Sequence, residues 1–281
     1  MTALRRWYSP TGLHPGDHAC WTFADAAGFS ATVVPFLEEG RQRGERLLLV
    51  GESQAAMLAA VSSLPRRAEL LASGQLEILA AADMYGSGRA LDPVAQVQHF
   101  RGAVDAALDR GHHGLRVAAD GSVLARAGSE GRRQLHIYER LADELAGSGP
   151  PLTGMCLYDA SLGDDVLGPL TVLHPIQHHG DREPLGHLSA RGPRLALHGD
   201  VDLSLADHVF PALVDLAGGA QGEVVLDLWD LDFLDVAGAR MLKRAVRRLA
   251  EVGVDLRLVG PRRAVARCLE LFDLLDGQVS A

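Results

Sequence analysis

The chain has 281 residues, of which 47% are hydrophobic and 22% are charged, and this composition is typical of a soluble globular protein. The formal net charge of −9 argues against nucleic-acid binding, because phosphate contacts require a basic surface and the arginine clusters here are interleaved with acidic residues. We expect a cytoplasmic protein, since the sequence has neither a signal-peptide core nor a run of about 18 apolar residues that could span a membrane.

The first half of the chain alternates predicted strands and helices. Short apolar runs predict strands at 18–23, 45–51, 75–81, 114–120 and 152–160. Apolar residues at helical spacing predict helices at 30–44, 54–64, 94–111 and 130–149. Strands that recur between helices of this length indicate βαβ units, so we expect an α/β fold with a mostly parallel sheet and helices on both faces.

A second, smaller unit follows a stretch without periodicity. Residues 177–193 are rich in His, Gly, Pro and charge, and we place a linker at 181–193 between a first domain at 12–180 and a second at 194–281. The second domain is predicted to contain strands at 194–203, 222–235 and 254–260 and helices at 206–218, 237–252 and 262–273. This domain has fewer than about 100 residues, which is still enough to form one hydrophobic core.

The second unit resembles the STAS domain of anti-sigma factor antagonists. The resemblance is carried by the order of the elements and by the segments LHGDVDLSLADH, VVLDLWDLDFLDVAGARML and VDLRLVGPRRAVARCLELFDL. In that family a partner kinase phosphorylates the second Ser of an acidic-Ser-Ser-Gly turn at a helix N-terminus, and the added charge disrupts binding. The resemblance therefore implies a partner that is an anti-sigma factor of the serine-kinase type or another STAS-domain regulator.

The corresponding turn of this chain, expected to form the partner-binding site, consists of Asp235, Val236, Ala237 and Gly238. Ala237 stands where the family has its phospho-acceptor, so this chain cannot be switched at that position. Independently of the resemblance, Asp235 is expected to cap the N-terminus of the following helix. Ser204 could supply a substitute hydroxyl, although its position before a helix, with Asp207 three residues later, favours an N-cap.

The first unit resembles the MEDS domain, the sensory domain of methanogen and methylotroph regulators, which is distantly similar to RecA-type ATPase cores. The motifs that carry the resemblance are GDHACWTFADAAGF, GERLLLVGE, GLRVAAD, IYERLADEL, GMCLYD and VLHP. Members of the family often have Met-Ser/Thr-Trp after the acidic residue that ends the GLRV strand. This chain instead has Gly121-Ser122-Val123 after Asp120, so that aromatic contribution to the site is missing.

The expected RecA-like sheet has no phosphate-binding loop. Nucleotide hydrolysis in such a fold requires G-x-x-x-x-G-K-[ST], whose backbone N–H groups, Lys and hydroxyl hold the phosphates and Mg²⁺. The loop after the first predicted strand, residues 24–29, reads ADAAGF and has one Gly and no Lys. We therefore expect no hydrolysis of ATP or GTP and no cofactor.

A small-molecule ligand is expected at the carboxyl ends of the strands, where open α/β sheets bind ligands. Cys156 and Asp159 are expected at these ends, together with the residues assigned to the ligand site, which are Asp17, His18, Cys20, Trp21, Arg116, Asp120 and Tyr158. His18 and Cys20 share one face of a strand, so they could reach a common ligand or metal, or serve the core as a hydrogen-bonded His and a buried Cys. Arg116 could bind an anion or pair with Asp120 or Asp17.

The sequence predicts neither a metal site nor a disulfide framework. The pairs His112-His113 and His178-His179 consist of adjacent residues whose side chains point apart, and no cluster of Cys or carboxylates completes a tetrahedral spacing. The three cysteines, which form no C-x-x-C motif, are Cys20, Cys156 and Cys268.

The sequence as a whole predicts a signalling regulator in which a non-hydrolytic small-molecule sensor controls a STAS module. The alternative is an enzyme, either a residual nucleotide hydrolase, which the missing phosphate loop opposes, or a thiol catalyst that uses Cys20 and His18. The thiol catalyst would require a lowered pKa at Cys20. A homodimer is compatible with the sequence, and neither nucleic acid nor membrane is expected as a partner.

Overall fold

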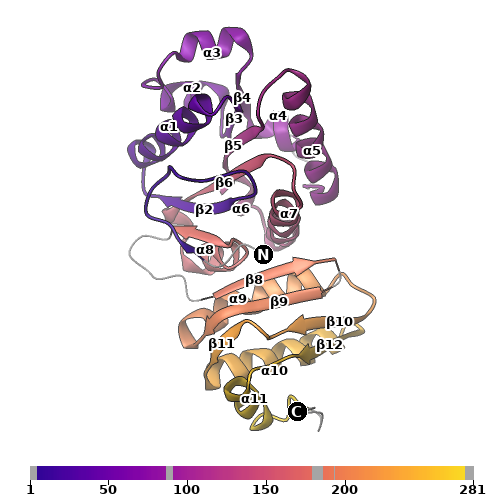
Figure 1. The fold of residues 1–281 in the computed structure, drawn as a ribbon. Coiled ribbons are helices and arrows are strands. Elements are labelled where there is room, and N and C mark those ends of the chain that lie inside the picture. Colours follow the sequence, from indigo (N-terminus) through magenta and orange to yellow (C-terminus); the bar gives the residue numbers. More distant parts are fainter. Residues whose placement is uncertain (1–4, 87–90, 179–185, 193, 276–281) are drawn as a thin grey trace.

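The computed structural model describes residues 5–86, 91–178, 186–192 and 194–275. It contains two α/β units, of which the second, in orange and yellow, lies below the first in Figure 1. Among the helices of these described ranges, none combines the length and the apolar character needed to cross a lipid bilayer.

Seven parallel strands form the sheet of the first unit. In chain order they are β1 (Arg5–Arg6), β2 (His18–Phe23), β3 (Arg46–Gly51), β4 (Leu76–Ala80), β5 (Leu115–Asp120), β6 (Leu152–Asp159) and β7 (Ile176–His178). Their order across the sheet is β1-β7-β2-β6-β5-β3-β4. Every residue of β5 is buried, as expected where helices cover both faces of a parallel sheet.

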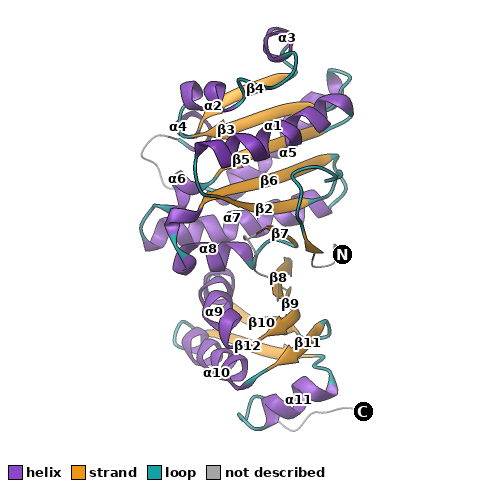
Figure 2. Ribbon diagram, turned by 90° about the vertical axis from the view of Figure 1, so that its left-hand side faces the viewer, coloured by secondary structure: helices purple, strands orange, loops and turns teal. Residues whose placement is uncertain are grey.

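Helices cover both faces of this sheet, which confirms the expected α/β architecture (Figure 2). One face is covered by α1 (Ala26–Gln42), α2 (Gln54–Ala60) and α3 (Arg67–Ser73). The other face is covered by α4 (Ala81–Tyr85), α5 (Pro93–Asp109), α6 (Ser122–Ala125), α7 (Ser129–Gly147) and α8 (Asp164–Thr171). A single 3₁₀ turn, η1 (Ala160–Leu162), connects β6 to α8.

Local sequence signals account for the ends of α5. The Asp92 carboxylate accepts hydrogen bonds from the backbone N–H groups of Val94 and Ala95, and Pro93 occupies the first helical position, where its missing N–H is not needed. The chain leaves this helix through Gly111, whose φ of 82° is in the left-handed region that glycine adopts without steric cost. The helix is thus bounded at the positions that its sequence predicts.

The second unit has a five-stranded sheet with helices. Its elements are β8 (Gly186–Arg191), β9 (Arg194–Val201), α9 (Leu203–Ala217), β10 (Gly222–Asp227), β11 (Leu231–Leu234), α10 (Val236–Ala250), β12 (Val254–Val259) and α11 (Arg263–Glu270). Strands β10 and β11 pair in parallel with the first and second parts of β9, and β12 pairs in parallel with β10. The strand predicted at 222–235 is therefore two strands, because Asp227 accepts a hydrogen bond from the N–H of Trp229 and turns the chain.

The segment that the sequence assigns to a linker contains a strand. Residues 186–191 form β8, which pairs antiparallel with β9, and β7 occupies 176–178. His187 and Leu188 are adjacent and both buried, so the strand is enclosed on both faces and lacks the alternation that would have revealed it. The remainder of the expected linker, 181–185, lies outside the described residues, as does residue 193.

The two units pack through α7, α8 and α9. Figures 1 and 2 both show α8 beside α9, and α7 also contacts α9 and β8. Val172 and Leu173, which follow α8, are buried in the hydrophobic core of the second unit. The N–H of Leu188 donates to the carbonyl of Val172 at 2.7 Å. The end of the first unit is therefore part of the second unit's core.

Candidate functional site

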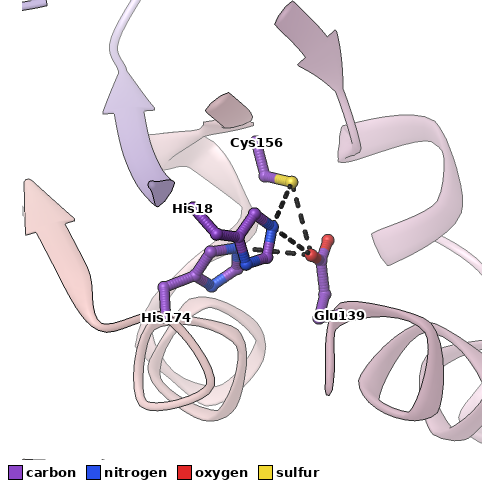
Figure 3. Close-up of side chains that lie close together, drawn as sticks. All are labelled: His18, Glu139, Cys156 and His174. Carbon is purple, nitrogen blue, oxygen red and sulfur yellow. Dashed lines mark hydrogen bonds and ion pairs between the residues drawn. The ribbon is translucent and has the colours of Figure 1, made fainter. Parts of the chain in front are cut away.

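Four side chains that can bind a metal lie together between the first sheet and α7 (Figure 3). They come from four parts of the chain, with His18 at the start of β2, Cys156 in β6, Glu139 in α7 and His174 in the segment between α8 and β7. All four are buried, and their ligand atoms lie within 4.8 Å of one another. The parallel register places Gly154 beside His18, and the missing side chain of Gly154 leaves room for the imidazole.

The contacts in this cluster converge on one carboxylate oxygen. Glu139 Oε2 lies 3.4 Å from His18 Nε2, 3.3 Å from His174 Nε2 and 3.3 Å from Cys156 Sγ. His18 Nε2 also lies 3.4 Å from Cys156 Sγ, and the centroids of the two imidazole rings are 4.2 Å apart. Glu139 Oε2 is thus the neighbour that the other three side chains share.

A second set of groups orients the cluster. Tyr158 donates its hydroxyl hydrogen to Glu139 Oε1, which leaves Oε2 facing the other three side chains. His174 Nδ1 lies 2.8 Å from the carbonyl oxygen of Leu170, so Nδ1 carries the hydrogen and Nε2 points into the cluster. His18 Nδ1 lies 3.7 Å from Asp143 Oδ1 on the next turn of α7.

The charges of the cluster depend strongly on one another. Burial by itself lowers the pKa of His18, but Cys156, Asp143 and Glu139 outweigh it, and this pKa lies well above its ordinary value. Burial and His18 lower the pKa of His174, yet Glu139 and Cys156 raise it to about 9 overall. Burial raises the pKa of Glu139, and the two histidines bring it far below its usual range. Glu139 is therefore a buried carboxylate held by its positive neighbours.

The residues that the sequence assigns to one ligand site are separated by the sheet. His18, Cys20 and Tyr158 face α7 and α8, whereas Trp21 and Arg116 face α1 on the other side. His18 also begins its strand, so it does not lie at a carboxyl end. The side chains of His18 and Cys20 therefore lie on the opposite face of the sheet from that of Arg116, because successive strand residues alternate between faces.

Arg116 has a structural role that the sequence does not reveal. It is the second residue of β5, fully buried, and its Nε donates to Glu45 Oε2 at 2.5 Å. Its other nitrogens reach Glu39 Oε2 at 3.3 Å and the carbonyl of Leu13 at 3.1 Å, and its guanidinium lies over the ring of Phe36. The described carboxylate partners of the guanidinium are thus Glu45 and Glu39, which occupy the place that an exogenous anion would take.

The surroundings of Cys20 oppose a role as a nucleophile. Its thiol is buried and lies 4.0 Å from the hydroxyl of Thr171. Burial, and after it the electrostatic effects of the nearby Cys156 and Glu139 side chains, raises the pKa of Cys20 well above its ordinary value. A nucleophilic cysteine requires the opposite shift, because the thiolate is the reactive form.

The remaining expected ligand residues have local partners. Asp17 accepts a hydrogen bond from the N–H of His14 at 2.9 Å, and Asp120, at the carboxyl end of β5, accepts one from the N–H of Ser122 at 2.9 Å. Burial raises the pKa of Asp120. The ring of Trp21 stacks on that of His178 with centroids 3.6 Å apart.

Among the described residues of the two adjacent histidine pairs, His112, His113 and His178 do not belong to the cluster of potential metal ligands. His113 Nδ1 lies 2.8 Å from the carbonyl of Arg43, and His178 contacts Trp21 as described above. The cluster of ligands found among the described residues instead uses His18 and His174. His179 lies outside the described part of the chain.

The loop after β2, which the sequence predicts to lack phosphate-binding groups, contains an aspartate that caps the N-terminus of α1. Asp25 caps α1, and its Oδ1 accepts a hydrogen bond from the N–H of Gly28 at 2.7 Å. A bound phosphate would need the N–H groups at this helix end and would meet the carboxylate already there.

The turn between β11 and α10 has the capped form that the sequence predicts. Asp235 Oδ1 accepts from the N–H of Gly238 at 2.7 Å, and Oδ2 accepts from the N–H of Leu203 at 3.0 Å, so one carboxylate holds the starts of α10 and α9. A Cβ at Gly238 would lie 2.7 Å from the carbonyl oxygen of Val201. Glycine is therefore required here by close backbone packing.

The start of α9 differs from the expected N-cap at Ser204. Asp202 is the cap residue, and its Oδ1 accepts hydrogen bonds from the N–H groups of Ser204 and Leu205. Ser204 is the second residue of the helix, is exposed, and donates its hydroxyl to Asp202 Oδ1 at 2.6 Å. An aspartate three residues before Leu205 is the stronger cap because its carboxylate is charged.

Sequence reasoning missed Glu139 and His174. Glu139 lies among the buried positions of α7, between Leu135 and Ala142 at helical spacing, and a carboxylate in an apolar stripe is the signal that could have revealed it. His174 stands in the apolar run 172–176, which the sequence shows but does not connect to β2.

A cavity of about 300 Å³ lies between the two units, beside the cluster. Asp143 belongs to both, because it lines the cavity and its Oδ1 faces His18. The rings of His187 and His198 stack at the opposite wall, with centroids 5.4 Å apart. The polar lining residues are Asp143, Glu144, Ser148, His187, Ser189, Arg191 and His198.

Comparisons with known proteins identify both units. Residues 17–175 match the family model of MEDS, the "MEthanogen/methylotroph, DcmR Sensory domain", and residues 193–278 match that of the STAS domain. No curated protein matches the chain. A solved structure described as "Crystal Structure Analysis of Mglu" is 33% identical over 31% of this chain and 23% of its own, with a TM-score of 0.25. The two matches follow the order expected from the sequence, and the chain belongs to the MEDS sensory-domain family, with a STAS domain after its MEDS domain.

Proposed function

We propose that this signalling regulator is non-hydrolytic, that its MEDS domain senses a small molecule, and that the sensed state controls how the STAS domain binds an anti-sigma factor. One observation carries the proposal. His174 belongs to the buried cluster of the MEDS domain, and the two residues before it, Val172 and Leu173, belong to the core of the STAS domain. A shift of His174 would therefore move side chains packed in the output domain, because close-packed cores transmit displacement.

Helix α7 supplies a second connection between the domains. It carries Glu139 of the cluster and, less than one turn earlier, His136, whose Nδ1 lies 2.7 Å from Asp215 Oδ2 on α9. Helix α8 approaches α9 closely, since a Cβ at Gly168 would lie 2.3 Å from the ring of His208. Helices α7 and α8, which border the cluster, thus both contact α9 of the STAS domain.

The cavity between the domains is the site that best fits a small-molecule ligand. It is enclosed by α7 of the MEDS domain and by β8 and β9 of the STAS domain, so a ligand in it would contact both domains. Its walls offer carboxylates, imidazoles, two hydroxyls and a guanidinium, which suits a small polar molecule with hydrogen-bonding groups. A ligand that displaced Asp143 would change the contact between Asp143 and His18 of the cluster.

The output surface is the turn at Asp235 with the apolar side chains beside it. The exposed fractions of Leu203, Phe233 and Val236 are 71%, 51% and 49%. Exposure of such apolar side chains to water is unfavourable, and a partner that covers them would remove this cost. Ala237 has no hydroxyl, so this turn stays in a form like the unphosphorylated, partner-competent state of the family. Control then comes from the MEDS domain.

The proposal is tested by affinity purification from a lysate of the native organism with three baits, the wild-type chain, Ala237→Asp and Ala237→Ser. We expect the wild type to enrich an anti-sigma factor of the serine-kinase type and Ala237→Asp to lose it, because the new carboxylate places charge in an apolar contact. Ala237→Ser should bind until ATP is added and then release the partner. Equal enrichment by wild type and Ala237→Asp would contradict the proposed surface, and phosphorylation of the wild-type chain at Ser204 with loss of binding would contradict the proposed route of control.

A further inference from the structure

We propose that His18, Glu139, Cys156 and His174 bind one Zn²⁺ ion in the interior of the MEDS domain. The four residues supply two imidazole nitrogens, one sulfur and one carboxylate oxygen, all buried and all within 4.8 Å of one another (Figure 3). Zn²⁺ commonly binds four ligands of these types in a tetrahedron. Binding of Zn²⁺ at this cluster requires neither the ligand nor the partner of the proposed function.

The spacing of the donor atoms fits a tetrahedral ion. Bonds of about 2.0–2.1 Å to nitrogen or oxygen and about 2.3 Å to sulfur place neighbouring donors of a tetrahedron about 3.3–3.7 Å apart. In the cluster, Glu139 Oε2 lies 3.3 to 3.4 Å from the donor atoms of the other three residues, and His18 Nε2 lies 3.4 Å from Cys156 Sγ. Four of the separations therefore have the length that a shared ion requires.

The surrounding groups hold the donors in the orientation that a metal needs. His174 directs Nδ1 to the carbonyl of Leu170 and Nε2 to the centre, and within the described residues this buried Nε2 has no hydrogen bond of proper geometry. Tyr158 binds the outer oxygen of Glu139, and Asp143 faces the outer nitrogen of His18. Carboxylates and carbonyls placed behind metal-binding histidines commonly fix their tautomer and orientation.

The charge of the bound centre also fits its burial. A thiolate at Cys156 and a carboxylate at Glu139 carry two negative charges, which the two charges of Zn²⁺ neutralise while both histidines stay neutral. Mg²⁺ and Ca²⁺ fit poorly, because they prefer oxygen ligands only.

A bound Zn²⁺ would join four parts of the first domain. It would link β2, β6 and α7 to the segment after α8, whose residues Val172 and Leu173 lie in the STAS core. With four protein ligands the ion would be structural, and its loss should loosen the attachment of the STAS domain.

The experiment uses the full chain without an affinity tag, so that no added histidines bind metal. We expect elemental analysis to find about one Zn²⁺ per chain, and replacement by Co²⁺ to give the intense visible absorption of a tetrahedral centre and a near-ultraviolet thiolate-to-cobalt band. Cys156→Ser should lose the thiolate band and stoichiometric zinc. Cys20→Ser is the matched control, because Cys20 lies on the same face of the sheet outside the four ligands, and it should keep both.

The proposal is overturned if the folded wild-type chain binds no Zn²⁺ when supplied with it, or if Cys156→Ser retains the full metal content and the thiolate band. Circular dichroism of each variant shows whether it is folded. If Cys156→Ser does not fold, Glu139→Gln provides the second variant, and the proposal then requires weaker Zn²⁺ binding in a folded protein that keeps the thiolate band. Unchanged affinity in Glu139→Gln would exclude Glu139 as a ligand and overturn the four-residue site.

Discussion

His136 of the MEDS domain and Asp215 of the STAS domain form a direct polar contact, with Nδ1 of the histidine 2.7 Å from Oδ2 of the aspartate. His136 is buried and precedes Glu139 by three residues on α7. Their side chains are therefore neighbours on the surface of one helix. The contact therefore joins the helix that borders the buried cluster to the first helix of the output domain.

Asp215→Ala should weaken the docking of the two domains. The change removes the partner of a buried imidazole, and we expect the free energy of unfolding to fall by about 1–2 kcal/mol. The measurement is urea denaturation followed by circular dichroism. Asp207→Ala on the same helix is the control, because its exposed carboxylate pairs with the exposed Arg244 at 3.6 Å and should contribute little. A loss in Asp207→Ala as large as that in Asp215→Ala would argue against a specific contact.

Gly238→Ala should destabilise the start of α10. A Cβ there would lie 2.7 Å from the carbonyl of Val201 and 2.5 Å from Leu234 Cδ1, so the helix must shift, at a cost of about 1–3 kcal/mol. Thermal denaturation measures this cost. Gly102→Ala provides the contrast, since this glycine of α5 has open space around it and alanine favours a helix by about 0.5–1 kcal/mol. Opposite signs are therefore expected for the two changes, and equal signs would contradict the packing described for Gly238.

Arg116→Leu should be among the most destabilising single changes in the MEDS domain. It leaves the buried carboxylate of Glu45 without its cation, and breaking a buried pair in this way costs about 3–5 kcal/mol. Arg46→Ala, which breaks the partly exposed pair with Glu77, should cost about 1 kcal/mol or less. Denaturant unfolding compares the two. A mild effect of Arg116→Leu would return Arg116 to the candidates for ligand binding.

His187 should make the stability of the chain depend on acid. Burial lowers the pKa of His187 from 6.5 to about 4, although Asp143 acts in the opposite direction. The unfolded chain binds a proton at His187 near pH 6.5 and the folded chain only near pH 4. Above pH 6.5 His187 is neutral in both states and does not reduce the free energy of unfolding. As the pH falls from 6.5 towards 4, the unfolded chain gains the proton first, and the free energy of unfolding falls by on the order of 3 kcal/mol.

The His187→Gln variant isolates this effect, because glutamine does not ionise. The free energy of unfolding, measured at several pH values between 4 and 7, should fall less steeply in this variant than in the wild type. His99→Gln, at an exposed position of α5, should keep the wild-type slope. Parallel slopes for wild type and His187→Gln would show that folding does not lower the pKa of His187.

A fragment of residues 194–281 should be less stable than one of residues 186–281. The shorter fragment lacks β8, so it loses the buried Leu188 and Ala190 and leaves residues 194–199 of β9 without their antiparallel partner. Burial of one leucine alone contributes about 2 kcal/mol. The comparison is made by thermal denaturation, and equal midpoints would mean that β8 contributes nothing to the STAS fold.

The sequence by itself determined the fold class, the order of both domains and the chemistry of the turn at Ala237. These features rest on local patterns. Apolar periodicity marks strands and helices, and Asp235 caps its helix through a hydrogen bond to a residue three positions away. The strand β8 escaped detection because burial on both sides removes the alternation on which such a reading depends.

Only the tertiary structure decided which side chains share a site. His18, Glu139, Cys156 and His174 come from four parts of the chain, and no spacing along the chain connects them. Trp21 and Arg116 lie on the opposite face of the sheet from His18, because alternate residues of a strand point to opposite faces. The order of the strands and the helices that cover them decide which residues each face contacts. The packing of Val172 and Leu173 in the second core likewise depends on how α8 lies against α9, which is a property of the assembled chain and of no single segment.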